Sequence, residues 1–128
     1  MAPSEVMTSI EFDALPEGRG SAFRKIARVA CDISKLTCAV AVQREGETCT
    51  HCRVALGAVA PTPVRARTVE AALEGRQIDA HAVADCAALV DGDISPINDI
   101  RCGELYRREA AGVLFKDAFQ TAWERARC

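Results

Sequence analysis

The 128-residue sequence lacks any apolar run close to the roughly 18 residues that a membrane-spanning helix needs. Its first residues, MAPSEVMTSIEFD, also lack the basic start and continuous apolar stretch of a secretory signal peptide. These absences predict a cytoplasmic protein with no membrane partner.

Runs of like charge and clusters of aromatic residues are also missing. Sixteen Lys and Arg residues are balanced by 18 Asp and Glu residues, which gives a net charge of −2. One Trp, one Tyr and four Phe are too few for a base-stacking platform. Because a phosphate backbone requires a basic face, we expect no nucleic-acid partner.

The familiar catalytic motifs are absent as well. The sequence contains no evident Ser–His–Asp set, no paired carboxylates in a recognisable pocket and no phosphate-binding loop. The glycines of EGRG (17–20) have no strand–turn–helix context, and the other glycines are isolated. We therefore predict no catalytic residues and no metal ligands in the chain itself.

The order of the patterns predicts a single α+β domain over residues 1–128, with strands over about 5–59 and helices over about 63–127. Strand-like alternation covers residues 6–12, 36–43 and 52–59. Helical patterns cover 63–75, with Thr62 as a cap and Pro63 at the first helical position, and 80–90, with Asp79 as a cap. A third covers 104–127, with an apolar stripe of Ala111, Leu114, Phe115, Ala118 and Ala122. Residues 21–30 fit a helix or a strand. We expect a mostly antiparallel sheet of three to four strands, with about three helices packed on one of its faces.

Seven cysteines is a high number for this length, but it is odd and the spacing shows no secreted disulfide framework. Cys49 and Cys52, in CTHC, have the spacing of a zinc or redox motif. If they lie on the returning strand, however, their side chains point to opposite faces, and only His51, His81 and scattered cysteines could complete a zinc site. The pattern favours free thiols over a metal site.

Four motifs occur in one order along the chain: ARVACDISKLT, ALGAVAPTPVRARTVEAAL, DISPINDIR and YRREAAGVL. Together they resemble the C-terminal domain of the flavoprotein part of the molybdenum hydroxylases, the family of xanthine dehydrogenase and the carbon monoxide dehydrogenase flavoprotein. The resemblance runs from about Glu5 to Ala126. It implies that residues 21–30 are a strand leading into a loop and that the CTHC is not a metal site.

The resemblance implies an electron-transfer function in which FAD is held mainly by a preceding domain, so that this chain begins after the flavin-binding part. The expected partners are an FAD-binding domain or subunit, an iron–sulfur subunit and a molybdopterin subunit, and the isolated chain is expected to be inactive. Arg24, Lys25, Arg28 and Asp32 match the strand end and loop that lie beside the flavin ring in the xanthine dehydrogenase group, and are the cofactor-binding candidates.

Each candidate has a simpler structural interpretation. Arg24 and Arg28 could be solvated charges at a strand edge, and Asp32 a turn residue that accepts backbone N–H groups. Arg101, Tyr106 and Arg107 match a family pattern that we interpret as a latch between a loop and the last helix. Two alternatives for the whole chain are a stand-alone interaction module that kept the fold, and a zinc- or redox-dependent protein using Cys49 and Cys52.

Overall fold

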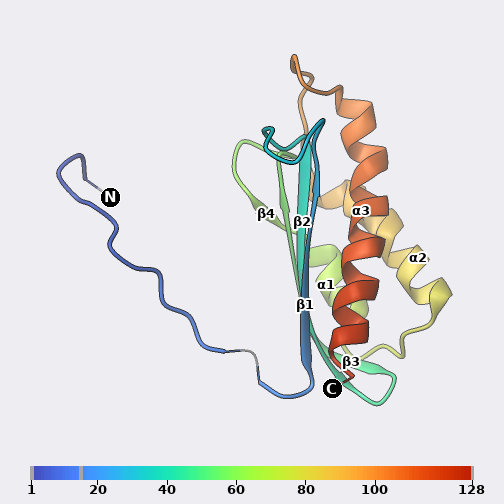
Figure 1. The fold of residues 1–128 in the computed structure, drawn as a ribbon. Coiled ribbons are helices and arrows are strands. Elements are labelled where there is room, and N and C mark those ends of the chain that lie inside the picture. The colour runs from blue at the N-terminus through green and yellow to red at the C-terminus, as the bar shows by residue number, and fades with distance from the viewer. Residues whose placement is uncertain (1, 15, 128) are drawn as a thin grey trace.

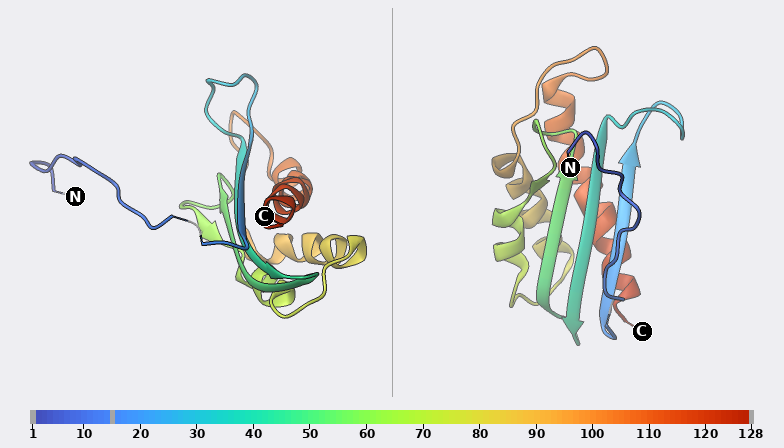
Figure 2. Two further views of the ribbon diagram at one scale, coloured as in Figure 1. Left: turned by 60° about the horizontal axis from the view of Figure 1, so that its bottom comes forward. Right: turned by 90° about the vertical axis from the view of Figure 1, so that its left-hand side faces the viewer.

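The computed structural model describes residues 2–14 and 16–127. Its elements are β1 (Arg19–Ile26), β2 (Leu36–Glu45), β3 (Thr48–Gly57), β4 (Val64–Arg65), α1 (Arg67–Leu73), α2 (Ala80–Leu89), a 3₁₀ turn (Val90–Asp93) and α3 (Glu104–Arg125). The strands form one antiparallel sheet in the order β1-β2-β3-β4. Within the described residues, all three helices lie on the same face of this sheet and none lies over the other face (Figures 1 and 2). The predicted α+β fold is confirmed.

Alternation along β2 separates the two faces of the sheet. Leu36, Cys38, Val40 and Val42 are buried toward the helices. The alternating neighbours Thr37, Ala39 and Ala41 are half-buried and small. A strand with a period of two residues therefore supplies the core on one side only, as the sequence predicted.

Helix α3 crosses the sheet at close range. Its apolar side is buried along its length and includes Ala111, Leu114, Phe115, Ala118 and Ala122, the predicted stripe. At Gly20 in β1 a Cβ atom would stand only 1.9 Å from the carbonyl oxygen of Ala122. The helix can approach β1 this closely only because residue 20 has no side chain.

The first helix begins later than its sequence signals indicated. Pro63 was expected at the first helical position, but residues 64–65 pair with β3 and α1 starts only at Arg67. The first turn is then capped from a distance, because the carboxylate of Asp93 accepts the Thr68 N–H at 3.0 Å. The backbone pairing of residues 64–65 with β3 therefore outweighed the local helix-start signal of Thr62 and Pro63. Asp79, by contrast, caps α2 as predicted and accepts the N–H of Ala82 at 2.7 Å.

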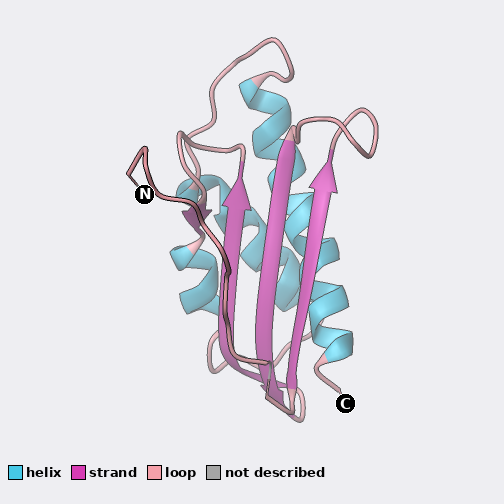
Figure 3. Cartoon of the chain, turned by 60° about the vertical axis from the view of Figure 1, so that its left-hand side comes forward, coloured by secondary structure: helices cyan, strands magenta, loops and turns pink. Residues whose placement is uncertain are grey.

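The predicted strand over residues 6–12 is wrong. No strand is assigned there, and Val6 and Phe12 are 83% and 88% exposed. This segment extends away from the sheet (Figure 1), and Figure 3 draws it as loop. Alternation gives a segment the side-chain pattern of a strand, but a strand forms only where a neighbouring strand offers hydrogen bonds.

No helix among the described residues is both long enough and apolar enough to traverse a bilayer.

The loop before α3 is tied to the helix through a buried arginine. Arg107 is 4% exposed and donates to Asp99 Oδ2 at 2.8 Å and to the carbonyl of Ile97 at 3.3 Å. Asn98 Oδ1 accepts the Glu104 N–H at 2.7 Å and so caps α3 where Gly103 offers no side chain. The predicted latch is thus made by Arg107. Tyr106 is exposed and takes no part in this latch. The Lys35 ammonium lies over its ring, with Nζ 5.9 Å from the ring centre.

We predict that the Asp99–Arg107 pair makes folding sensitive to acid. The Arg107 hydrogen bond, helped by the N–H groups of Arg101 and Cys102, lowers the pKa of Asp99 to about 2. Since a carboxyl group in an unfolded chain titrates near about 4, the stabilisation is present above that pH and is lost as the pH falls toward 2. Urea unfolding between pH 7 and 2.5 should therefore show a smaller loss of stability in Asp99→Asn than in the wild type. Parallel pH profiles for the two proteins would contradict this.

Candidate functional site

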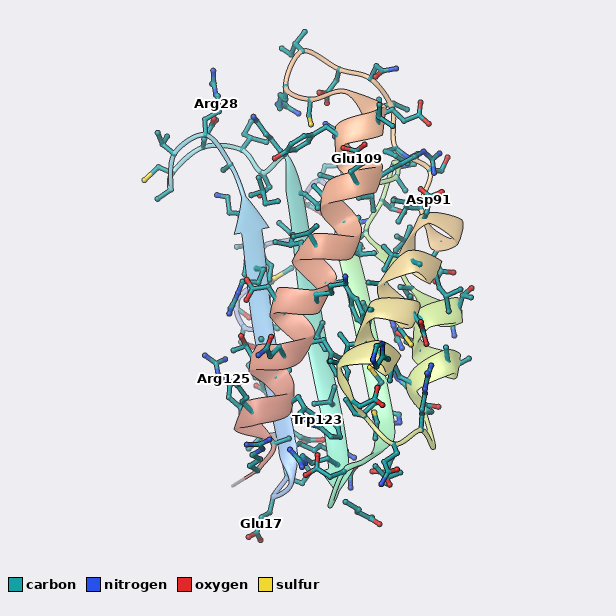
Figure 4. The ribbon with its side chains drawn as sticks, turned by 90° about the vertical axis from the view of Figure 1, so that its right-hand side faces the viewer. Glu17, Arg28, Asp91, Glu109, Trp123 and Arg125 are labelled. Atoms are coloured by element: carbon teal, nitrogen blue, oxygen red, sulfur yellow. The ribbon has the colours of Figure 1, made fainter. Side chains whose placement is uncertain are left out.

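The candidate site is the loop that joins β1 to β2 at one end of the sheet, where Arg28 projects at the top of Figure 4. The loop is closed at its base by a hydrogen bond from the Lys35 N–H to the Ile26 carbonyl at 2.8 Å. Inside it, the Lys25 ammonium donates to the carbonyls of Ala30 and Asp32 at 3.1 and 2.7 Å. Lys25 therefore holds the shape of the loop, and two of its three donors are engaged in doing so.

Arg28 and Asp32 form an ion pair across this loop. The Arg28 Nε donates to Asp32 Oδ2 at 2.8 Å, and the other carboxylate oxygen accepts the Ile33 N–H at 2.8 Å. The Arg28 hydrogen bond, followed by that from the Ile33 N–H, lowers the pKa of Asp32. Asp32 is thus the turn residue that the sequence suggested. The Arg28 side chain remains 77% exposed, so most of its donors face outward.

The loop also exposes apolar side chains. Val29 and Ile33 are 66% and 61% exposed, and Arg28, Val29, Cys31 and Asp32 line a shallow hollow. Ile33 was missed in the sequence, although an apolar residue between two turn formers in a loop is a recognisable signal. A flat apolar surface beside a guanidinium can contact one side of a planar, partly anionic ligand.

Arg24 does not join this group. On β1 it faces α3, where its Nε donates to Asp117 Oδ2 at 2.6 Å and its Nη2 to Thr121 Oγ1 at 2.5 Å. The hydrogen bond to Asp117 raises the pKa of Arg24, and its charge is directed at the helix. The structure therefore brings Lys25, Arg28 and Asp32 together and places Arg24 in the contact between sheet and helix.

The prediction that Cys49 and Cys52 point to opposite faces is wrong. Gln43 pairs with His51 but Arg44 pairs with Cys49, which leaves Thr50 as an extra residue in β3. This β-bulge shifts the alternation by one residue, so that both thiols are fully buried on the helix side of the sheet. The hydrogen bond with Cys52 is the main cause that lowers the pKa of Cys49, and the same bond together with burial raises that of Cys52.

The thiol pair has no ligand set around it that would suit zinc. Within residues 2–14 and 16–127 no group of three or more His, Cys, Asp or Glu side chains is placed to hold a metal ion. His81 is on the exposed side of α2. Cys38 and Cys86 are also buried, and burial raises the pKa of the Cys38 thiol to about 12. These cysteines act as small apolar core residues.

Comparison with known proteins assigns the family. The model of the CO dehydrogenase flavoprotein C-terminal domain matches residues 21–122, which is most of the chain. This chain therefore belongs to the CO dehydrogenase flavoprotein C-terminal domain family, and the resemblance stated from the four motifs is confirmed.

Individual relatives agree with this assignment. The chain is 34% identical over 125 residues to the carbon monoxide dehydrogenase medium chain of Hydrogenophaga pseudoflava and 33% identical over 116 residues to the glyceraldehyde dehydrogenase medium chain of Sulfolobus acidocaldarius. These matches cover 98% and 91% of this chain but 43% and 41% of the relatives. The chain thus spans less than half the length of these relatives.

Solved structures share the fold. A carbon monoxide dehydrogenase from H. pseudoflava superposes with a TM-score of 0.84 at 37% identity, over 88% of this chain and 39% of that one. Quinoline 2-oxidoreductase from Pseudomonas putida superposes with a TM-score of 0.79 at 26% identity, over 84% and 38%. The one-sided sheet with three helices is therefore shared with these oxidoreductases.

We predict that the Cys49–Cys52 pair is inert in the folded chain, since buried thiols react only when the structure opens. Because Cys102 is only partly buried, the background is Cys102→Ser with Cys128→Ser. In it, a short iodoacetamide pulse followed by peptide mass mapping should modify exposed Cys31 at least roughly 100-fold faster than either buried thiol. The Cys31→Ser variant should lose the fast reaction. Labelling of Cys49 or Cys52 at the rate of Cys31 would contradict burial and favour the redox alternative.

Proposed function

We propose that this chain is the C-terminal domain of the FAD-containing medium subunit of a molybdenum hydroxylase of the carbon monoxide dehydrogenase and xanthine dehydrogenase type. In this role the β1–β2 loop covers one side of the flavin ring. The family match over residues 21–122 carries the proposal. The exposed loop at the end of the sheet supports its second part.

The side chains of the loop fit the ring of FAD. Val29 and Ile33 offer exposed apolar surface, and Arg28 adds a largely exposed guanidinium that favours negative charge on a neighbouring ring. Lys25 has a supporting role, because its ammonium fixes the backbone that carries Arg28 and Asp32. When bound, FAD supplies the capacity to accept electrons and to pass them on.

The pyrophosphate of FAD has no equivalent fit here. Among residues 2–14 and 16–127, the stretch containing Gly18 and Gly20 leads into a strand, whereas a phosphate-binding loop leads into a helix N-terminus. The flavin phosphates would therefore be held by another part of the subunit. An iron–sulfur subunit and a molybdopterin subunit are the further partners that this role requires.

Affinity capture tests the proposal. The tagged chain is recovered from an extract of the cells that encode it, under mild conditions, and its absorbance spectrum and bound polypeptides are determined. We expect a flavin-binding polypeptide to be recovered together with flavin and iron–sulfur absorbance. A colourless chain recovered alone from an extract in which the related enzyme stays intact would overturn the proposal and favour the stand-alone interaction module.

Charge changes in the loop test its position beside the ring. In the captured complex, Arg28→Ala should lower the reduction potential of the flavin and Asp32→Asn should raise it, each by on the order of tens of millivolts. The opposite signs follow from removing a positive and a negative charge. Arg127→Ala, near the other end of the fold, is the control and should leave the potential unchanged. Equal potentials in all four proteins would place the loop away from the flavin.

A further inference from the structure

A second pocket lies at the same end of the sheet, between three loops. It has a volume of about 290 Å³, and its lining includes Ser34, Ala58, Ser95, Asp99, Arg101 and Arg107. Ser34 comes from the β1–β2 loop, Ala58 from the β3–β4 connection, and the others from the loop before α3 and from its first turns. These three segments meet at the top of the view in Figure 1. We call this the loop pocket.

Arg107, one of the residues that line the loop pocket, carries a buried donor that has no partner among the described residues. Arg107 is 4% exposed, and its two terminal nitrogens are engaged by Asp99 and the Ile97 carbonyl. Its Nε–H is buried and has no hydrogen-bond acceptor within the described part of the chain. A buried N–H of a charged group without an acceptor is costly, so the group requires either a water molecule or a ligand.

The charges of the loop pocket indicate which ligand. Arg101 lies beside Asp99 at 3.9 Å, beyond hydrogen-bonding range, and about half of its side chain is exposed. Two guanidinium groups therefore face one carboxylate, which leaves one positive charge to be balanced. A monoanion balances this charge, whereas a dianion would add repulsion from Asp99. The fork of a guanidinium also matches the two oxygens of a carboxylate.

The backbone at the pocket wall is strained. Ala58 has a φ of 63°, in the left-handed region that residues other than glycine rarely adopt. Ala58 directly follows β3, which ends at Gly57. It lines the pocket together with Ala60 and Pro61.

We propose that the loop pocket binds a carboxylate, held between the guanidinium groups of Arg101 and Arg107. The carboxylate is either a small free molecule or the side chain of an Asp or Glu from a neighbouring polypeptide. Because Ser34 lies two residues from Asp32, an occupied pocket would also support the loop that carries Arg28. The inference is independent of the flavin proposal, since it concerns binding by this chain alone.

The test is a titration of the ¹⁵N-labelled chain with acetate at constant ionic strength, followed by the Nε–H resonances of its arginines. We expect the Arg107 and Arg101 resonances to shift saturably, with half-saturation at about 1–10 mM acetate. Arg101→Gln should weaken binding roughly tenfold. Arg127→Gln removes the same charge near the opposite end of α3 and should bind as the wild type does.

Two further titrations separate the sources and the chemical class. N-acetyl-glutamate methylamide represents a side chain of a neighbouring polypeptide. Binding of acetate alone assigns the pocket to a free molecule, and binding of both admits a partner's side chain. The proposal would be overturned if chloride caused the same changes in the arginine Nε–H resonances, or if the changes were the same in Arg101→Gln. The Arg107 Nε–H would then be assigned a water molecule as its acceptor. Stronger shifts with phosphate than with acetate would overturn the carboxylate assignment.

Discussion

The close contact between α3 and the sheet is the constraint on which the rest of the structure depends. The helix buries Phe115, Ala118 and Ala122 against strands whose fully buried residues are apolar. At Gly20 the backbone of β1 and the backbone of α3 leave no room for a Cβ atom. In the described part of the chain α1 and α2 share this face with α3, so that α2 packs against α3 and α1 packs against α2 and β3.

The antiparallel sheet also determines where functional groups can gather. The β1–β2 loop and the β3–β4 connection emerge at the same end, since alternate turns of an antiparallel sheet lie together. Helix α3 begins at this end and brings the loop that carries Asp99 (Figure 1). The proposed flavin-facing loop and the loop pocket are therefore neighbours, joined through residues 32–34.

One inserted residue shows how a tertiary feature can reverse an argument from spacing. The interval between Cys49 and Cys52 implies opposite faces in a regular strand, but the bulge at Thr50 places both thiols in the core. The interior position then makes them core residues that interact with each other. A bulge is specified by the pairing with β2, and that pairing is not visible in the CTHC motif.

The sequence by itself determined the α+β class, the β2 alternation, the Asp79 cap and the apolar stripe of α3, because each depends on residues a few positions apart. It also carried the four motifs that identify the family. Only the tertiary structure decided that Arg24 faces Asp117, that residues 6–12 form no strand, and that α1 begins at Arg67. These outcomes depend on whether a residue or strand distant in sequence lies alongside, and local propensity contains no information about that.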